Sequence, residues 1–283
     1  RVTGKLDEFA CDAEVIHVDI DPAEISKNRC PQLALIGDVR KVMLEFLKKV
    51  RFNYSEIEAS QTQNWLSRIY KWKDLYPLSL KNYKVQNLSP QEIIAHMGNE
   101  YKEGIFTTDV GQHQMWSAQL INSMPKNWSS SAGLGTMGFG LPAAIGAQVA
   151  NPDKNVICIS GDSSFQMNIQ ELGTIAQYNL PIKIVILNNG WQGMVRQWQE
   201  SFYGNRFSNS YMRNGMPDFP AVARAYGLDG FTITEFDQFK KIIQDYKTVN
   251  QTLLFDITVI ENENCYPMVA PGRSNAQMLG LEK

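Results

Sequence analysis

Two oxygen-bearing side chains, each placed just after an apolar run, are the most informative feature of this sequence. Asp162 comes shortly after the run Val156–Ser160, and Asn189 comes shortly after the run Ile182–Leu187. Carboxylate and amide oxygens are ligands that Mg²⁺ prefers, and proteins usually leave several of its six positions to phosphate oxygens and water. The pair therefore predicts a magnesium site that takes a phosphorylated ligand.

The elements that must position this pair form a strand, helix and strand in sequence. Both runs predict buried strands, and a helical stripe of apolar residues lies between them. A right-handed crossover would make the two strands parallel neighbours. Asp162 and Asn189 would then share the carboxyl edge of the sheet, where open α/β folds bind ligands. The stripe consists of Ile169, Leu172, Ile175 and Ala176.

A plainer interpretation of the same residues remains open at this point. Asp162 could cap a helix, and Asn188-Asn189 could form an ordinary turn after a strand. Short motifs of this kind occur by chance in many proteins. The strand-like runs before both residues, joined by one helix of suitable length, favour the metal site.

Composition excludes several classes of protein. The 283 residues are 43% hydrophobic with a formal net charge of -2 and no basic run, which disfavours disorder and a nucleic-acid partner. Four cysteines without a C-x-x-C pair fit a reducing compartment better than disulfides or a zinc knuckle. No apolar run approaches the roughly 18 residues of a membrane helix. We expect a soluble intracellular protein, and the first residue, Arg1, suggests that upstream sequence is missing.

The pattern along the chain predicts an α/β protein: a doubly wound, mostly parallel sheet preceded by the tail of a second α/β domain. We expect this tail at residues 1–75, a polar linker at 76–88 and the main domain at 89–283. Capping chemistry predicts helix starts after Asp21, with Glu24, and after Ser89, with Glu92. The strand candidates are 15–20, 105–110, 156–160, 182–187, 231–234 and 254–260, and the helical runs outside the stripe above are 39–50, 65–75 and 239–246.

A second glycine cluster, from Gly133 to Gly140, formally matches the G-x-G-x-x-G pattern of nicotinamide-binding folds. The segments on either side of this cluster differ from the strand and helix that flank the nicotinamide-binding motif. The preceding segment 128–132 is not typical of a buried strand, and Pro142 predicts that the helix begins only after the glycines. A nicotinamide dehydrogenase is therefore the least favoured hypothesis, and unchanged absorbance at 340 nm would refute it.

Four sequence blocks together identify a family resemblance. Gly161-Asp162 through Asn188-Asn189 resembles the thiamine-diphosphate signature, with Ser163 where a glycine is usual. With the neighbouring blocks, the chain resembles the catalytic large subunit of acetohydroxyacid synthase, also called acetolactate synthase, over its carboxyl-terminal half. Several variants are closest to the cyanobacterial and red-algal plastid branch. The four blocks are Gly111–Trp116, Gly133–Pro142, Gly161–Glu171 and Gly193–Trp198, and the branch variants include Asn188–Gly193 and Ala270–Asn275.

The resemblance implies three cofactors: thiamine diphosphate, Mg²⁺ and FAD. It implies that Asp162, Asn189 and the carbonyl of Trp191 hold the metal. The implied thiamine-diphosphate residues are Val110, Gly111, Gln112, His113, Gly135, Met137, Asp162, Ser163, Ser164, Asn189, Trp191, Gln192, Gly193, Met194 and Val195. The implied FAD residues are Arg1, Asp19, Ile20, Asp38, Val39, Ala132 and Gly133.

Met194, Trp198 and Phe202 recur every four residues, and this periodicity alone predicts a buried helical stripe. The resemblance implies instead that Met194 and Trp198 line the substrate channel. There Trp198 would favour 2-ketobutyrate as second substrate and would stack on herbicides that block the channel.

By the same resemblance, the enzyme decarboxylates pyruvate on thiamine diphosphate and adds the hydroxyethyl carbanion to pyruvate or 2-ketobutyrate, in branched-chain amino acid biosynthesis. The catalytic glutamate of the family comes from the amino-terminal domain of a neighbouring subunit. No catalytic acid or base is therefore expected in this chain, which should be nearly inactive alone.

The alternative functions of the chain are those of a pyruvate oxidase, a glyoxylate carboligase or a non-catalytic cofactor-binding fragment.

The resemblance also implies partners and a compartment. The intact subunit would form a homodimer or tetramer and could associate with a regulatory small subunit. Its compartment would be the cytoplasm in a cyanobacterium or the plastid stroma in an alga.

Overall fold

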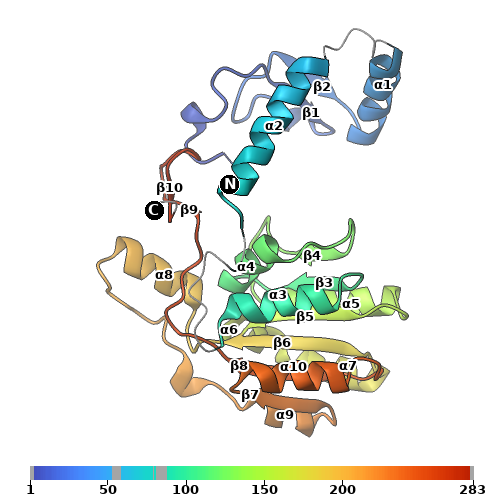
Figure 1. The fold of residues 1–283 in the computed structure, drawn as a ribbon, viewed down its shortest axis with the longest axis vertical. Coiled ribbons are helices and arrows are strands. Elements are labelled where there is room, and N and C mark those ends of the chain that lie inside the picture. Colours follow the sequence, from blue (N-terminus) through green and yellow to red (C-terminus); the bar gives the residue numbers. More distant parts are fainter. Residues whose placement is uncertain (1–2, 53–58, 79, 81–87, 281–283) are drawn as a thin grey trace. The chain divides into compact units, whose positions relative to one another are not determined.

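The computed structural model describes residues 3–52, 59–78, 80 and 88–280. Their contacts divide the chain into two compact units (Figure 1). Unit 1 comprises Arg1–Pro77 and Tyr266–Lys283, and unit 2 comprises Leu78–Cys265. No helix among the described residues is both long and apolar enough to cross a membrane.

The last residues of the chain are grouped with unit 1, whereas the sequence pattern predicts one domain from 89 to 283. Backbone pairing explains the difference. Gly4 forms an antiparallel bridge with Ser274, and the Lys5 N–H donates to the Arg273 carbonyl at 2.9 Å. Most of the predicted linker 76–88 lies outside the described residues, and the predicted domain limits remain predictions.

Unit 2 is built on a six-stranded parallel sheet, which confirms the predicted fold class. The strand order is β4-β3-β5-β6-β8-β7. Every residue of β5 and all but the last of β6 are buried, as expected for a parallel sheet covered on both faces. The strands are β3 (Ile105–Thr108), β4 (Trp128–Ser130), β5 (Val156–Gly161), β6 (Ile182–Asn188), β7 (Asp229–Ile233) and β8 (Leu253–Thr258).

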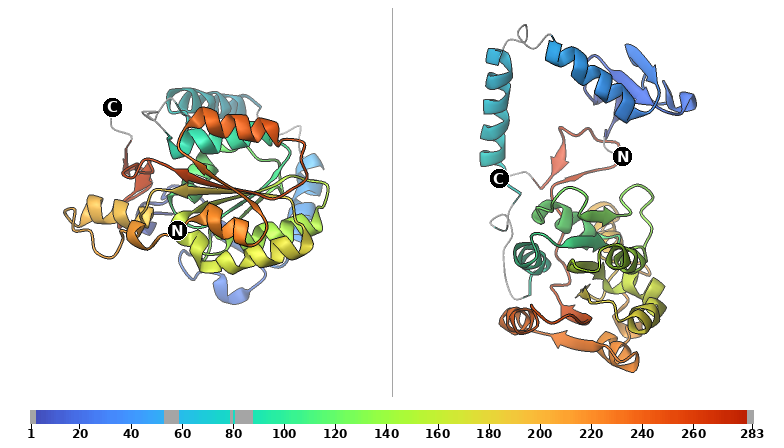
Figure 2. Two further views of the ribbon diagram at one scale, coloured as in Figure 1. Left: turned by 90° about the horizontal axis from the view of Figure 1, so that it is seen from below. Right: turned by 90° about the vertical axis from the view of Figure 1, so that its right-hand side faces the viewer.

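Helices cover both faces of this sheet (Figure 2). One apolar core joins the sheet to α3 (Pro90–Glu100), α4 (Gln112–Leu120) and α10 (Phe236–Asp245). The core on the other face joins it to α5 (Gly140–Ala150), α6 (Asp162–Phe165), α7 (Leu172–Tyr178) and α9 (Phe219–Ala225). The predicted stripe at 169–176 is divided, because a 3-10 segment, Gln166–Glu171, with a kink at Asn168 precedes α7.

The winding of the sheet reverses between β3 and β5. The chain leaves β3 for the edge strand β4 and then returns to β5 on the other side of β3. A reversal of this kind opens a crevice at the carboxyl ends of the two strands, where ligands bind in doubly wound folds. The predicted site residues after β3 and β5 lie at this position.

Two local features of unit 2 differ from the predictions. Strand β4, which pairs in parallel with β3, was not among the predicted strands; its residues are half-buried because it lies at the sheet edge, which agrees with the prediction that segment 128–132 is not a buried strand. The helix predicted after Ser89 begins at Pro90, but the Ser89 side chain does not cap it. Its Oγ lies 2.5 Å from Oε1 of Gln91 instead.

Unit 1 contains a two-stranded parallel sheet and two long helices. The helix predicted after Asp21 is a single 3-10 turn (Pro22–Glu24), in which Oδ1 of Asp21 accepts from the Ala23 N–H. Strand β2 was not predicted. The elements are a 3-10 turn at Leu6–Glu8, β1 (Ile16–Asp19), β2 (Leu33–Ile36), α1 (Val39–Phe52), α2 (Ala59–Leu75) and the antiparallel pair β9 (Met268–Val269) and β10 (Met278–Leu279).

Candidate cofactor and metal site

Three neighbouring strands of unit 2 end at the same edge of the sheet. Strands β3, β5 and β6 lie side by side and are followed by the segments 109–113, 162–164 and 189–193. These three segments contain most of the residues predicted to bind thiamine diphosphate. The sheet topology therefore brings together residues that are more than 80 positions apart in sequence, such as Val110 and Gly193.

The loop carrying Asn189 is hydrogen-bonded directly to Asp162. Oδ2 of Asp162 accepts from the Gly190 N–H at 2.7 Å, and its Oδ1 accepts from the Ser163 N–H at 2.8 Å. Oδ1 of Asn189 accepts from the N–H of Trp191 at 3.0 Å. The three predicted metal-binding residues thus belong to one hydrogen-bonded turn at the ends of β5 and β6.

Asp162 is almost fully buried, with 2% of its surface exposed. Burial, opposed by the two backbone hydrogen bonds, raises the pKa of its carboxyl group to about 7. Keeping a buried carboxylate ionised is costly, and a bound cation would reduce that cost. The position is therefore electrostatically suited to a metal ion.

Ser163 occupies its position without backbone strain. It lies in the first turn of α6 and does not have the positive φ that would favour glycine. Its N–H is directed to the Asp162 carboxylate. The departure from the usual glycine is therefore compatible with the local fold.

His113 lies in a narrow space between two glycines. A Cβ atom on Gly111 would lie 3.0 Å from Cε1 of the imidazole, and one on Gly161 would lie 3.0 Å from its Nδ1. Burial lowers the pKa of His113 to about 4, opposed by a hydrogen bond with the Asp109 backbone. The buried Nε2 has no partner within the chain, which leaves it available to a ligand.

Gln112 connects this edge of the sheet to the segment after β8. Its Nε2 lies 2.8 Å from both Oε1 of Gln197 and the Glu263 carbonyl, while its buried Oε1 has no partner. A Cβ atom on Gly193 would overlap this Oε1 and would lie 2.9 Å from Nδ2 of Asn189. Gln112, Asn189 and Gly193 are therefore packed together, as expected for residues of one site.

Asp109 is a residue of the site that the sequence patterns missed. It is 1% exposed, and its carboxylate accepts from the N–H groups of Gly138 at 2.8 Å and Gly140 at 3.2 Å. These bonds hold the glycine-rich loop that carries Gly135 and Met137. The helix α5 begins at Gly140, the last glycine of the cluster, two residues before the start that Pro142 predicted. The position of Asp109 directly after a buried strand was the available signal.

The remaining residues of the predicted set lie on the same segments. The Ser164 hydroxyl donates to the Val110 carbonyl at 3.0 Å, which joins the ends of β3 and β5. Gln192 immediately precedes α8 (Gly193–Phe202), and Met194 and Val195 lie in its first turn.

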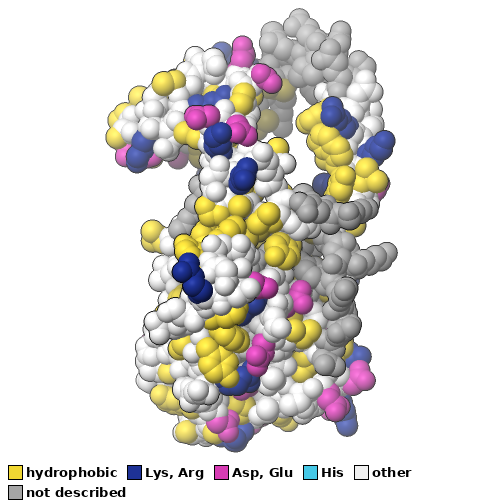
Figure 3. All heavy atoms as spheres, turned by 90° about the vertical axis from the view of Figure 1, so that its left-hand side faces the viewer, with side chains coloured by type: hydrophobic (Ala, Val, Ile, Leu, Met, Phe, Trp, Pro, Cys, Tyr) yellow, Lys and Arg dark blue, Asp and Glu magenta, His cyan; other side chains and the backbone are white. Residues whose placement is uncertain are grey.

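Periodicity predicted a buried stripe on α8, and this prediction is wrong. Trp198 and Phe202 are 38% and 37% exposed, whereas the buried residues of the helix are Arg196 and Gln197. Arg196 donates to Glu200, the Glu263 carbonyl and Asn264, so polar contacts hold this helix. These two aromatic residues consequently remain exposed. Figure 3 shows one face of the molecule, on which hydrophobic side chains reach the surface among charged ones.

The donor set fits magnesium shared with a diphosphate. Among the described residues, no group of three or more His, Cys, Asp or Glu side chains could hold a metal by itself. One carboxylate, one amide and one carbonyl leave coordination positions that phosphate oxygens and water would fill. The buried Nε2 of His113 and Oε1 of Gln112, both without partners, lie on the adjoining segment.

In unit 1, four of the predicted flavin residues follow two parallel strands. Asp19 and Ile20 come at the end of β1, and Asp38 and Val39 come just after β2. Ile20 and Val39 are 71% and 59% exposed. Oδ1 of Asp38 accepts from the Lys41 N–H at 3.0 Å and so caps the start of α1.

The other three predicted flavin residues do not follow either of these strands in the sequence. Arg1 lies outside the described residues. Ala132 and Gly133 belong to unit 2, where they follow β4.

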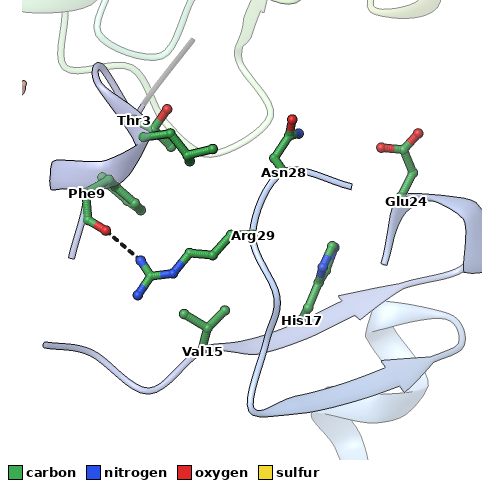
Figure 4. Close-up of a pocket in the computed structure, with 8 residues that line it drawn as sticks. Thr3, Phe9, Val15, His17, Glu24, Asn28 and Arg29 are labelled. Carbon is green, nitrogen blue, oxygen red and sulfur yellow. Dashed lines mark hydrogen bonds between the residues drawn. The ribbon is translucent and has the colours of Figure 1, made fainter. Parts of the chain in front are cut away.

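Unit 1 also contains a pocket of about 400 Å³ (Figure 4). Arg29 lines it, but its guanidinium group donates to the carbonyls of Phe9, Ala10 and Ala13. These bonds reduce its capacity to bind an anion. The pocket contains none of the predicted cofactor residues; its lining residues are Thr3, Leu6, Phe9, Val15, His17, Glu24, Asn28 and Arg29.

Comparison with protein families agrees with this arrangement. Residues 109–257 match the C-terminal TPP binding domain of thiamine pyrophosphate enzymes, and residues 1–47 match the central domain of the same enzymes. The first match alone covers more than half of the chain and includes the three segments that follow β3, β5 and β6. The chain belongs to the thiamine pyrophosphate enzymes.

Individual relatives narrow the comparison to one kind of enzyme. The chain is 57% identical to the acetolactate synthase large subunit of Porphyra purpurea, over 100% of the chain and 48% of the relative. It is 53% identical to the acetolactate synthase large subunit of Parasynechococcus marenigrum, over 99% of the chain and 45% of the relative. It is 42% identical to the acetolactate synthase isozyme 2 large subunit of Escherichia coli, over 99% of the chain and 49% of the relative.

These relatives confirm the resemblance to acetolactate synthase large subunits that the motifs indicated. The chain spans about half the length of the curated relatives it matches.

Proposed function

We propose that this chain is the cofactor-binding part of an acetolactate synthase large subunit. The observation that carries the proposal is the 2.7 Å hydrogen bond from the Gly190 N–H to the Asp162 carboxylate. This bond joins the two halves of the predicted signature at the carboxyl edge of a parallel sheet. The key residues of the two halves, Asp162 and Asn189, are 27 positions apart in the sequence. The similarity to acetolactate synthases over the whole chain supports the same conclusion.

In this proposal, Asp162, Asn189 and the Trp191 carbonyl hold Mg²⁺, which in turn holds the diphosphate of thiamine diphosphate. When bound, that cofactor supplies the stabilised carbanion chemistry needed to decarboxylate a 2-keto acid and form a new carbon–carbon bond. The chain's own groups bind and orient the cofactor. His113 and Gln112 contribute their unpartnered buried atoms beside the metal turn, and the loop anchored by Asp109 presents Gly135 and Met137.

The substrates in this proposal are pyruvate and either a second pyruvate or 2-ketobutyrate. Met194 and Trp198 would border the channel through which they enter. The exposure of Trp198 supports this role, because a side chain that contacts substrate must not be covered by the chain's own core.

We also propose a flavin site on unit 1, at the ends of β1 and β2. Asp19 and Asp38 follow adjacent parallel strands, and an acidic residue at such a strand end is suited to bind ribose hydroxyls. The match of residues 1–47 to the central domain of the family supports this placement.

The partners and compartment are part of the same proposal. The relatives are named large subunits, which supports assembly with further subunits, as a homodimer or tetramer and with a small regulatory chain. The relatives from red algae and a cyanobacterium support a plastid or cytoplasmic enzyme.

Calorimetric titration with thiamine diphosphate, with and without Mg²⁺, tests the cofactor site. We expect saturable binding that needs Mg²⁺ and that Asp162→Ala abolishes. Asp153→Ala is the matched control, because Asp153 is an exposed aspartate of the same unit in the turn before β5. Binding that is equal in wild type and Asp162→Ala would refute the proposed metal site.

A further inference from the structure

The segment Ser210–Arg213, which we call the strap, pairs with the turn that carries the predicted metal ligands. The Met212 N–H donates to the Gly190 carbonyl at 2.8 Å, and the Gln192 N–H donates to the Ser210 carbonyl at 2.8 Å. Trp191 and Tyr211 face each other across this short antiparallel pairing. The strap therefore holds the backbone on both sides of Trp191.

This pairing decides the direction of the Trp191 peptide groups. In an antiparallel pair, the backbone groups of successive residues point alternately toward and away from the partner. Because the Gly190 carbonyl and the Gln192 N–H point toward the strap, the N–H and carbonyl of Trp191 point away from it. The Trp191 N–H accordingly donates to Oδ1 of Asn189. The Trp191 carbonyl is thus directed to the side on which the Asn189 amide lies.

Aromatic contacts fix the Trp191 side chain from the same region. Its ring centroid lies 4.8 Å from that of Tyr211 and 5.4 Å from that of Phe207, both in edge-to-face geometry. Such pairs stabilise a defined arrangement of the rings. They oppose a rotation of the Trp191 peptide that would redirect its carbonyl.

Arg213, the last residue of the strap, packs against the metal turn itself. Its Nη2 lies 2.6 Å from Oε1 of Glu261 and 3.4 Å from the Asn189 carbonyl. A Cβ atom on Gly190 would lie 2.9 Å from Nε of Arg213, so only glycine allows this approach; its φ is +73°. The ion pair with Glu261 is half-exposed and adds little energy by itself. Its effect is to fix the guanidinium group against the turn.

We propose that the strap, and Arg213 in particular, is a positioning element for the metal site. It presets the direction of the Trp191 carbonyl, so that the third ligand is in place before the cation arrives. The inference rests on the proposed function, because the cation is the Mg²⁺ of the proposed cofactor site. Arg213 acts through the turn and is not itself a ligand.

The test measures the affinity of the protein for Mn²⁺, a paramagnetic substitute for Mg²⁺, in the presence of thiamine diphosphate. The electron paramagnetic resonance signal of the free ion gives the unbound concentration. Arg213→Met keeps the aliphatic stem but removes the donors and the charge. We expect its Mn²⁺ affinity to fall about tenfold, equivalent to about 1.4 kcal/mol. Arg213→Lys should restore part of the loss, because it keeps the charge but not the planar fork. Thermal melting of each variant without ligand shows whether the protein is folded, and so separates weaker Mn²⁺ binding from loss of the fold.

Arg206→Met is the matched control. Arg206 is exposed, and its Nε donates to the Tyr203 carbonyl at 3.0 Å, a bond that does not involve the metal turn. This variant should bind Mn²⁺ like the wild type. An Arg213→Met protein that folds and binds Mn²⁺ as tightly as wild type would overturn the inference, as would an equal loss in both variants.

Two further outcomes are decisive. If wild type itself fails to bind Mn²⁺ with thiamine diphosphate, the proposed function fails, which distinguishes that result from failure of the strap alone. If Arg213→Met does not fold, Glu261→Gln decides the question, because it keeps the Arg213 side chain but removes the ion pair that fixes it. We expect about threefold weaker Mn²⁺ binding in Glu261→Gln; wild-type affinity would contradict the inference.

Discussion

The carboxylate of Asp109 accepts a hydrogen bond from the Gly138 N–H at 2.8 Å and thereby ties the end of β3 to a loop 29 residues further along the chain. The other carboxylate oxygen accepts from the Gly140 N–H. Burial raises the pKa of Asp109, while these backbone hydrogen bonds oppose that shift. The side chain thus organises the glycine-rich loop of the proposed cofactor site, although no sequence motif indicated it.

An asparagine side chain has one acceptor oxygen, whereas the Asp109 carboxylate uses two to accept from the Gly138 and Gly140 N–H groups. In Asp109→Asn one of these buried N–H groups would lose its partner, and we therefore expect the free energy of unfolding of unit 2 to fall by about 1–3 kcal/mol. Urea unfolding followed by circular dichroism measures this change. Asp153→Asn, at an exposed turn, should leave the midpoint unchanged. An Asp109→Asn midpoint equal to that of wild type would show that the loop is held by other contacts.

Metal binding at Asp162 should depend on pH. The pKa of this carboxyl is about 7 without metal, so below pH 7 the cation must displace a proton. The apparent Mg²⁺ affinity should rise by about tenfold per pH unit up to about pH 7 and level off above it. Calorimetry in buffers of different ionisation enthalpy should detect proton release at pH 6 and little at pH 8. Blank titrations of Mg²⁺ into thiamine diphosphate correct for protons released by the cofactor, and proton release independent of pH would contradict the prediction.

Acid should destabilise unit 2 through His113. The pKa of its imidazole is about 4 in the folded chain, against 6.5 for an unburied histidine, so the unfolded state binds the proton more readily. The stabilising contribution of the neutral imidazole is fully present above pH 6.5 and is lost as pH falls toward 4. The unfolding constant should rise by about tenfold per pH unit in that window.

Urea unfolding at several pH values measures this dependence. His113→Gln should make the unfolding constant of unit 2 less dependent on pH. His17→Gln, in unit 1, should leave the pH dependence of unit 2 unchanged. A pH dependence that His113→Gln leaves intact would assign the acid sensitivity to other groups.

Two glycines should respond oppositely to alanine. In Gly193→Ala the new Cβ would overlap Oε1 of Gln112, whose amide is held by two hydrogen bonds, so we expect thiamine diphosphate to bind at least about tenfold more weakly. In Gly146→Ala, within α5, the Cβ meets nothing within 4 Å. This control should stabilise unit 2 by about 0.5–1 kcal/mol without changing cofactor affinity. Unchanged binding in Gly193→Ala would show that Gln112 can move without cost.

Trp198→Leu should alter the choice of second substrate in active acetolactate synthase that contains this chain. Loss of the large exposed ring should lower the ratio of 2-aceto-2-hydroxybutyrate to acetolactate by roughly tenfold, within the discrimination that apolar contacts provide. Chromatography of products formed from mixed pyruvate and 2-ketobutyrate gives the ratio. Tyr203→Leu, at an exposed aromatic residue directly after the same helix, is the matched control. An unchanged ratio in Trp198→Leu would remove Trp198 from the substrate channel.

The sequence by itself determined the architecture of unit 2 and the central pair of the site. Nearly continuous apolar runs at 156–160 and 182–187 predicted buried parallel strands, because strands covered on both faces carry mostly apolar residues. Chirality of the crossover then placed Asp162 and Asn189 at one edge. These properties are local or follow from general rules of chain winding, so one sequence is sufficient to predict them.

Only the tertiary structure decided which distant groups meet. The bonds of Asp109 to Gly138 and of Arg213 to Glu261 join segments whose separation no periodicity encodes. Helix α8 shows the same limit, since its four-residue spacing predicted a buried apolar stripe, yet its buried residues are Arg196 and Gln197. Periodicity records which side chains share a face of a helix, but only the packing of the whole unit decides whether that face is covered.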